Sequence, residues 1–190
     1  MPDHEPIDDS VPALRQIGST VTFETPWLTI TQDDVVRPDG STTQFGVVRT
    51  PDFALVIPFD GEKYHLVEQF RYPVGRRLWE FPQGALRDRP DAEPEEIART
   101  ELAEETGLRA ESFQRLGYLH EAYGRATTGF HAFLATGLTQ GPHAREIDES
   151  DMRTGTFTMD EIWSMIDDGS ITDASTVSSL ALLERWRSRV

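Results

Sequence analysis

Three glutamates, Glu101, Glu104 and Glu105, stand in a segment with the marks of a helix, and they constrain the fold more than any other part of the chain. Pro94 suits the first position of a helix, acidic residues crowd the turn after it, and Gly107 suits the end. The sequence therefore predicts a helix that begins at the proline and ends just before the glycine. At about 100° per residue, the three carboxylates fall within an arc of about 100° on one face.

Like charges this close on one helix face repel one another. A fold tolerates them most easily where a cation lies among them, and a group of carboxylate oxygens suits Mg²⁺ or Mn²⁺. The alternative is that the acids form a solvated helix surface and bind nothing. The sequence segments on either side of the helix distinguish a metal-binding site from a solvated helix surface.

The part of the chain before this helix has the composition of β-strands from about residue 21 to residue 81. Its short runs are rich in β-branched and aromatic residues, and turn residues separate them. Short runs joined by short turns are typical of antiparallel meanders. We expect strands within residues 20–23, 27–30, 44–49, 53–57 and 63–70.

The part after this helix is expected to contain both strands and helices, so the fold class is α+β. Val177, Leu180, Leu183 and Trp186 recur three residues apart and would give the last helix one apolar face. We expect strands near residues 113–120, 130–135 and 155–158, and helices over residues 159–168 and 174–187.

The chain has 190 residues, which suits one domain with a small appendage. The first residues are polar and acidic, so we expect a flexible acidic arm over residues 1–16. An N-terminal antiparallel β segment would follow over residues 17–60, and the main domain would occupy residues 61–190.

Thirty-three acidic residues against eighteen lysines and arginines give a net charge of −15, which disfavours binding to nucleic acid through a basic face. There is no cysteine, which excludes disulfides, cysteine-bound zinc, iron–sulfur clusters and thiol nucleophiles. The best apolar run, residues 53–58, is too short to span a membrane. The first ten residues lack the apolar core of a secretion signal, so we expect a cytoplasmic protein without a membrane partner.

A strand that runs into a glycine turn, Trp79-Glu-Phe-Pro-Gln-Gly84, precedes the acidic helix, with a polar loop between them. Together with the glycine stop, these elements resemble the Nudix box, G-x5-E-x7-R-E-U-x-E-E-x-G-U, in which U is apolar. The resemblance implies an α/β/α sandwich with a mixed sheet, and divalent-metal-dependent cleavage of a nucleoside diphosphate linked to another moiety. The positions in register are Glu101, Leu102, Glu104, Glu105, Gly107 and Leu108.

The sequence departs from the box in three places. Thr100 stands at the position of the box arginine, and the neighbouring Arg99 points about 100° away around the helix. The loop acid falls at Ala92, with Glu93 one residue further on, and the loop from Gly84 to the helix is two residues longer than the pattern. By the resemblance, the missing arginine and acid are mainly structural partners of the ligating glutamates.

The resemblance extends to the ADP-ribose pyrophosphatase group, also called ADP-sugar diphosphatases. It implies that Gln69, Arg71 and Glu80 help to hold the nucleoside and the terminal ribose. Arg71 offers a bidentate fork for a phosphate group. The alternatives are a surface arginine on a strand and a solvated acid at a sheet edge. The segments that carry this resemblance are residues 67–75, 78–84 and 169–176.

The same resemblance supplies a ligand set for Mg²⁺, or for Mn²⁺ in its place. It consists of the side chains of Glu101, Glu104 and Glu105 with the backbone carbonyl of Gln83.

A second acidic cluster, over residues 146–151, follows a loop and precedes a strand. In the enzymes that the chain resembles, the loop at this point carries a glutamate that acts as general base or as an added metal ligand. We expect Glu149 to have this role, with Glu146 and Asp148 as alternatives, and Glu104 as a second catalytic candidate. A loop acid run of this kind can also be simply solvated.

The resemblance implies hydrolysis of the diphosphate bond of ADP-ribose or a related ADP-sugar to AMP and a sugar phosphate. It also implies a homodimer, in which the N-terminal β segment pairs the subunits and completes the nucleotide site. Three alternatives stay open: a hydrolase of another nucleoside diphosphate derivative, a degenerate Nudix domain that binds a nucleotide without cutting it, and a structural or interaction protein whose acids are only solvated.

The acidic residues are concentrated where such a site would need them. Residues 84–107 hold eight acids and three arginines, and residues 146–151 hold four acids and no base. These two segments carry −9 of the net −15. The charge pattern therefore favours the metal-binding reading over general solubility.

Overall fold

The computed structural model describes residues 13–86, 89, 92–142 and 151–189. The chain divides into two compact units, and each is considered by itself. Of the described residues, the first unit contains those up to Thr50 together with Ala122–Thr127, and the second contains those between Pro51 and Glu121 and those from Thr128 onward.

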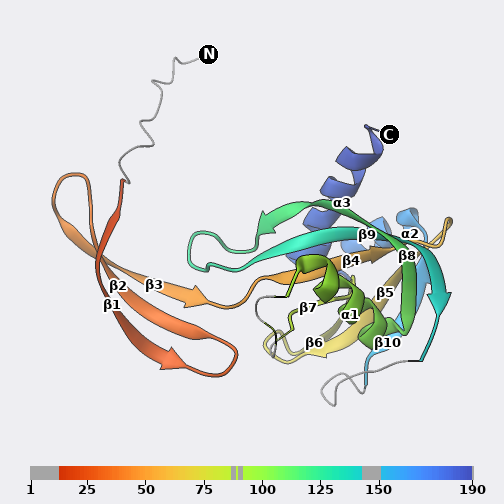
Figure 1. The fold of residues 1–190 in the computed structure, drawn as a ribbon, viewed down its shortest axis with the longest axis horizontal. Coiled ribbons are helices and arrows are strands. Elements are labelled where there is room, and N and C mark those ends of the chain that lie inside the picture. The colour runs from red at the N-terminus through yellow and green to blue at the C-terminus, as the bar shows by residue number, and fades with distance from the viewer. Residues whose placement is uncertain (1–12, 87–88, 90–91, 143–150, 190) are drawn as a thin grey trace. The chain divides into compact units, whose positions relative to one another are not determined.

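The first unit is a three-stranded antiparallel sheet in the order β1-β2-β3 (Figure 1). Its strands are β1 (Arg15–Glu24), β2 (Thr29–Val36) and β3 (Thr42–Arg49). The predicted antiparallel meander is confirmed here, although the first two strands are longer than the short runs that the sequence marks. A parallel bridge between Val48 and Ala126 joins the segment 122–127 to this unit.

The second unit contains a mixed four-stranded sheet and a three-stranded antiparallel sheet. The mixed sheet has the order β7-β4-β9-β8, with β4 (Phe53–Pro58), β7 (Gln83–Gly84), β8 (Leu108–His120) and β9 (Gly129–Gln140). The other has the order β10-β5-β6, with β5 (Tyr64–Arg71), β6 (Arg76–Glu80) and β10 (Arg153–Phe157).

The expected meander is wrong for β4. This strand pairs in parallel with β9, far along the chain, and antiparallel with the short β7. The physical reason lies in the composition of β4, whose residues Ala54 to Ile57 are all fully buried. A continuous apolar run suits a central strand that is covered on both faces.

The helices begin and end close to where the sequence places them: α1 is Pro94–Thr106, α2 is Met159–Asp167 and α3 is Ala174–Arg187. Gly107 has the left-handed φ of 73° that a helix end favours, and its N–H donates to the carbonyl of Ala103. At the start of α2, Thr158 and Glu161 form a reciprocal capping box. None of the helices in the described residues is long and apolar enough to cross a membrane.

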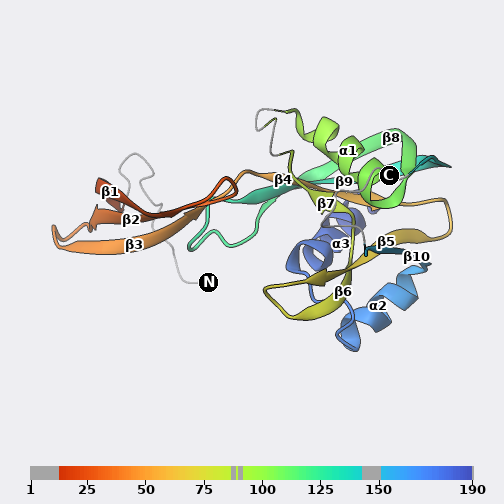
Figure 2. The same ribbon diagram turned by 90° about the horizontal axis from the view of Figure 1, so that it is seen from below.

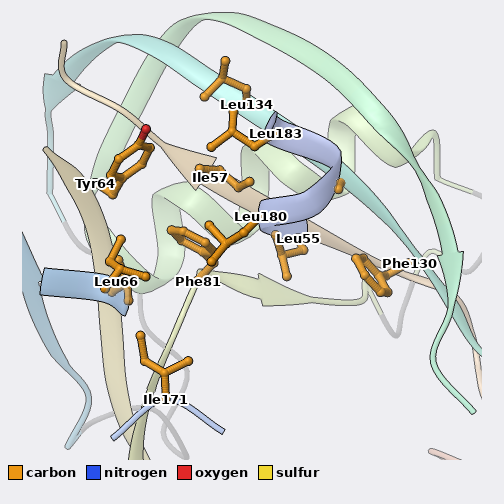
Figure 3. Packing of buried hydrophobic residues seen from close by; sticks show 12 residues of the cluster. Leu55, Ile57, Tyr64, Leu66, Phe81, Phe130, Leu134, Ile171, Leu180 and Leu183 are labelled. Carbon is orange, nitrogen blue, oxygen red and sulfur yellow. The ribbon is translucent and has the colours of Figure 1, made fainter. Parts of the chain in front are cut away.

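Side-chain alternation along β4 produces two apolar cores. Leu55 and Ile57 face one core, which includes Leu183 of α3, while Val56 faces the other, which includes Leu102 of α1. Figure 2 shows α1 and α3 on opposite sides of β4 and β9, and Figure 3 shows the side chains of the first core. The central strands therefore lie between two layers of helix, as expected for an α/β/α sandwich.

Candidate active site

The acidic face of α1 lies against the glycine turn at β7. Glu101 and Glu105 are almost fully buried, at 6% and 2% exposure, and Glu104 is half-buried. A Cβ atom added to Gly84 would lie 2.6–2.7 Å from the carboxylate atoms of Glu101. A side chain at this position would displace the Glu101 carboxylate, so the glycine is what allows this carboxylate to approach the backbone.

Gln83 connects this turn to a second carboxylate. Its backbone N–H donates to Oε2 of Glu105 at 3.2 Å. Gln83 also stands opposite Leu55 in the pairing of β7 with the central strand β4, which fixes its backbone. The structure thus brings three of the four predicted metal-binding residues, Gln83, Glu101 and Glu105, to one place, with Glu104 on the same helix.

Within the described residues, no group of three or more histidine, aspartate or glutamate side chains is arranged to hold a metal ion. The carboxylates of Glu101 and Glu105 instead lie against Gly84 and the N–H of Gln83. Their donor chemistry still suits a hard divalent cation, because all the candidate ligands present oxygen. A bound cation would have to draw these carboxylates together.

Glu80 is the centre of a second cluster. Its buried carboxylate accepts hydrogen bonds from Nε2 of Gln69 at 2.7 Å and from Nε of Arg71 at 3.1 Å, and it forms an ion pair with the Arg71 guanidinium. Of the three predicted substrate-binding residues, Gln69 and Arg71 both therefore contact Glu80, and the fork of Arg71 engages this carboxylate. Glu80 is 2% exposed, which differs from the alternative of a solvated edge acid.

Burial and the neighbouring charges shift the pKa values of Glu80 and Arg71. Burial raises the pKa of Glu80 above its ordinary value, with a further contribution from Asp173, and outweighs the opposing effects of Arg71 and Gln69. Burial works against the charged form of Arg71, but Glu80, Glu105 and Asp173 together raise the pKa of its guanidinium. The influence of Glu105 on Arg71 links this cluster electrostatically to the acidic face of α1.

Sequence reasoning missed Asp173. This residue is the N-cap of α3, and its Oδ2 accepts hydrogen bonds from the backbone N–H of Thr176 at 2.7 Å and from Nε2 of Gln83 at 3.0 Å. The capping pattern Asp-x-x-Thr before the helix was a visible signal for the first bond. The bond to Gln83 spans ninety positions of the chain and has no local signal.

The structure describes the surroundings of three residues at or beside the departures from the box, Arg99, Ala92 and Glu93. Arg99 pairs with Glu95 one turn earlier and lies over the ring of Phe113 at 4.3 Å, so it serves the side of α1 away from the acidic face. Ala92 packs against the second core, and Glu93 is the N-cap of α1 without a capping hydrogen bond from its side chain.

Glu146, Asp148 and Glu149 lie outside the described residues, and the role expected for Glu149 stays a prediction. Asp151, the last acid of that cluster, is described and pairs with Arg77, whose guanidinium also contacts Glu68. Asp151 is therefore held by a structural ion-pair network at the edge of β5 and β6.

Replacing Arg71 with methionine tests the buried pair. We expect Arg71→Met to lower the free energy of unfolding by about 1–3 kcal/mol near neutral pH, because Glu80 loses the partner of its buried charge. The loss should shrink toward about pH 5, since the raised pKa of Glu80 lets the native state take up the proton before the unfolded state does.

Urea denaturation at about pH 5 and about pH 8 measures both effects. Arg153→Met is the matched control, because Arg153 is 70% exposed and its pair with Glu68 should contribute less than about 1 kcal/mol. Equal losses at the two pH values would contradict the assignment of the effect to Glu80.

Comparisons with known families agree with this arrangement. Residues 15–48 match the nucleoside diphosphate sugar hydrolase N-terminal domain, and residues 49–178 match the NUDIX domain. The fold resembles that of the crystal structure of an ADP compounds hydrolase, with a TM-score of 0.82, 17% identity, and coverage of 93% of this chain and 95% of that one. The expected Nudix fold is confirmed.

Curated sequence relatives support the same family assignment. The chain is 30% identical to an ADP-ribose pyrophosphatase of Bacillus subtilis (strain 168) over 154 residues, 80% of this chain and 82% of that protein. It is 32% identical to an ADP-ribose pyrophosphatase of Mycobacterium tuberculosis over 151 residues, which cover 78% of this chain and 72% of that protein. It is 33% identical to a methanol dehydrogenase activator of Bacillus methanolicus over 154 residues, which cover 80% of this chain and 82% of that protein. The chain therefore belongs to the Nudix family and is a Nudix hydrolase in which an N-terminal nucleoside diphosphate sugar hydrolase domain precedes the NUDIX domain.

Proposed function

We propose that the protein hydrolyses the diphosphate bond of ADP-ribose or a related ADP-sugar to AMP and a sugar phosphate, with Mg²⁺ or Mn²⁺ as cofactor. The observation that carries the proposal is the approach of Glu101 and Glu105 to the glycine turn, where no side chain intervenes. The choice of substrate is supported by the two relatives that are named ADP-ribose pyrophosphatase.

The residues at this turn fit a hard cation by their chemistry. Glu101, Glu104 and Glu105 with the backbone carbonyl of Gln83 offer only oxygen ligands, the kind that Mg²⁺ prefers. A bound Mg²⁺ would supply charge neutralisation for the diphosphate and a bound water of lowered pKa. The carboxylates in turn require a cation near the substrate, because without one they would repel its negative diphosphate.

The chain itself must move the proton of the attacking water. A carboxylate oxygen of Glu104, or of Glu149 as the sequence predicts, takes this proton. The water oxygen then forms a bond to one phosphorus of the diphosphate, and the bridging oxygen leaves with the other phosphate group. Among Glu101, Glu104 and Glu105, half-buried Glu104 is the most open to solvent.

The cluster around Glu80 supports a role at the nucleoside or ribose end of the substrate. Arg71 is still 39% exposed at its side chain, so the guanidinium keeps donors available beyond those that meet Glu80. The residues before and after Arg71 in sequence, Phe70 and Tyr72, are 48% and 87% exposed, and an exposed ring offers a face on which a base can stack. Phe70 projects from the opposite face of β5, so Tyr72 is the ring that we propose for this role. By contrast, Trp79 packs on Phe157 within the structure.

The family assignment and the relatives named ADP-ribose pyrophosphatase favour a hydrolase over the remaining alternative. That alternative is a Nudix domain that binds a nucleotide without cutting it, and it rests on the absence of the box arginine at Thr100 and on Ala92, which stands at the loop-acid position and packs against the second core. Metal-dependent turnover of any nucleoside diphosphate derivative would exclude it.

The variant Glu105→Gln tests the role of the buried carboxylate in turnover. We expect ADP-ribose to yield AMP with Mg²⁺ or Mn²⁺, and Glu105→Gln to lower kcat by about 10²-fold or more, because the buried carboxylate supports transition-state charge through the cation. A panel of nucleoside diphosphate derivatives ranks the substrates, with AMP release followed by chromatography. Glu95→Gln is the control on the same helix, since Glu95 is exposed and paired with Arg99. Full activity of Glu105→Gln would contradict the assigned role.

The variant Gly84→Ala tests the role of the glycine turn. Gly84→Ala places a Cβ within 2.7 Å of the Glu101 carboxylate and forces that carboxylate away. We expect kcat/KM to fall by about 10²-fold, the effect typical of misplacing a catalytic group by about 1 Å. Gly124→Ala, where an added Cβ meets nothing within 4 Å, should leave the rate unchanged. Equal rates for the two variants would show that this close approach has no part in catalysis.

We further propose that the segment 17–60 pairs two subunits through the sheet of β1, β2 and β3. Val21 of β1 and Phe45 of β3 lie on the same face of the first unit's sheet and are 56% and 38% exposed. Exposed apolar side chains that share a face are typical of an interaction surface, and a second copy of the chain is the partner that we infer.

Light scattering of the full chain tests this proposal. We expect the mass of a dimer for the wild type and the mass of a monomer for Val21→Lys, because a charge on this face opposes its burial. Thr20→Lys changes the neighbouring residue on the opposite face of β1 and should remain dimeric. A monomeric wild type would contradict the proposal.

A further inference from the structure

Asp173 joins two parts of the second unit that are far apart in sequence. A single carboxylate oxygen, Oδ2, accepts both the N–H of Thr176 at the start of α3 and the side-chain Nε2 of Gln83 at the glycine turn. The first bond caps the helix. The second fixes the carboxamide of a residue whose backbone is expected to bind the cation.

The start of α3 also holds the strand that leads into this turn. The backbone N–H of Phe81 donates to Oγ1 of the fully buried Thr176 at 3.0 Å, and the N–H of Trp79 donates to the carbonyl of Ser170 at 2.9 Å. Together with the bond from Gln83 to Asp173, these contacts tie residues 79–83 to the start of α3 at two points and to the segment just before it at a third. The backbone of the turn is therefore placed by α3 as well as by β4.

The other end of Gln83 reaches α1. Its backbone N–H donates to Oε2 of Glu105 at 3.2 Å, so Gln83 lies between the carboxylates of Asp173 and Glu105. A carboxylate can only accept, so Asp173 also decides which way the carboxamide is turned. The amide oxygen of Gln83 then faces away from Asp173, and among the described residues it has no hydrogen-bond partner although it is buried.

We propose that Asp173 is a positioning residue for the acidic face of α1, and that it acts through Gln83. This inference rests on the proposed metal-dependent hydrolase function. Asp173 holds the carboxamide, the carboxamide holds the turn, and the turn presents its N–H to Glu105 and its carbonyl to the cation. Partners of this kind, one step behind the ligands, typically change metal affinity by about 10- to 100-fold when they are removed.

The test is calorimetric titration with Mn²⁺ in the absence of substrate, together with kcat and KM for ADP-ribose. We expect Asp173→Ala to weaken Mn²⁺ binding by about 10- to 100-fold and to lower kcat. Asp173→Asn should stay within about threefold of wild type, because asparagine is an equal N-cap and its one amide oxygen can accept both N–H groups. Loss in both variants alike would assign the effect to the charge of Asp173 and overturn the positioning role.

Thr158→Ala is the matched control for helix capping. It removes the cap of α2, which has no bond to Gln83, and we expect it to lower the thermal midpoint while leaving Mn²⁺ affinity unchanged. If Thr158→Ala weakened Mn²⁺ binding as much as Asp173→Ala, the effect would be a general consequence of lower stability, and the proposal would fail.

A double-mutant cycle tests whether Asp173 acts on Mn²⁺ binding through Gln83. Gln83→Ala removes the carboxamide and keeps the backbone N–H, so we expect Asp173→Ala to add almost nothing to it. Additive losses would show that Asp173 does not act through Gln83. Wild-type protein that binds no Mn²⁺ and does not turn over would contradict the proposed function instead, whereas tight binding by Asp173→Ala would contradict only the role of Asp173.

Discussion

The close approach of α1 to the backbone at Gly84 is the contact on which the rest of the site depends. The carboxylate of Glu101 occupies the space that a Cβ would fill, and Glu105 accepts from the N–H of the preceding residue, Gln83. This approach requires a helix anchored on its apolar side, and Leu102, fully buried in the second core, supplies that anchor. The same helix thus has one face packed on β4 and another that brings carboxylates to a turn.

The site concentrates buried acids at a cost to stability. Glu80, Glu101 and Glu105 are each at most 6% exposed, and an isolated buried carboxylate is strongly unfavourable. Arg71 and Gln69 compensate Glu80, and the N–H of Gln83 compensates Glu105. A cluster of buried acids of this kind is suited to a ligand that brings positive charge, as the proposed cation does.

Local features of the fold could be predicted because their causes are local. Proline at the start and glycine at the end of α1 fixed both of its boundaries, and the three-residue spacing of Leu180 and Leu183 identified the buried face of α3. The glycine turn and the positions of the glutamates were likewise readable, because the register of the box places them on one helix face.

Long-range features could not be predicted in the same way. The parallel pairing of β4 with β9 joins strands separated by more than seventy positions, and short turns before β4 favoured a meander instead. Arg71 was expected to face a phosphate, and only the fold shows that Glu80 engages its fork. The bond between Asp173 and Gln83 depends on where α3 docks, which no local pattern in either segment specifies.

Anomalous scattering from a crystal grown with Mn²⁺ would show whether a cation binds among the carboxylates of Glu101 and Glu105. We expect an anomalous peak at the glycine turn, within about 2.0–2.3 Å of carboxylate oxygens of Glu101 or Glu105 and of the backbone carbonyl of Gln83. A Mn²⁺ peak away from α1, or fully bound Mn²⁺ with these carboxylates unmoved and uncoordinated, would contradict this expectation.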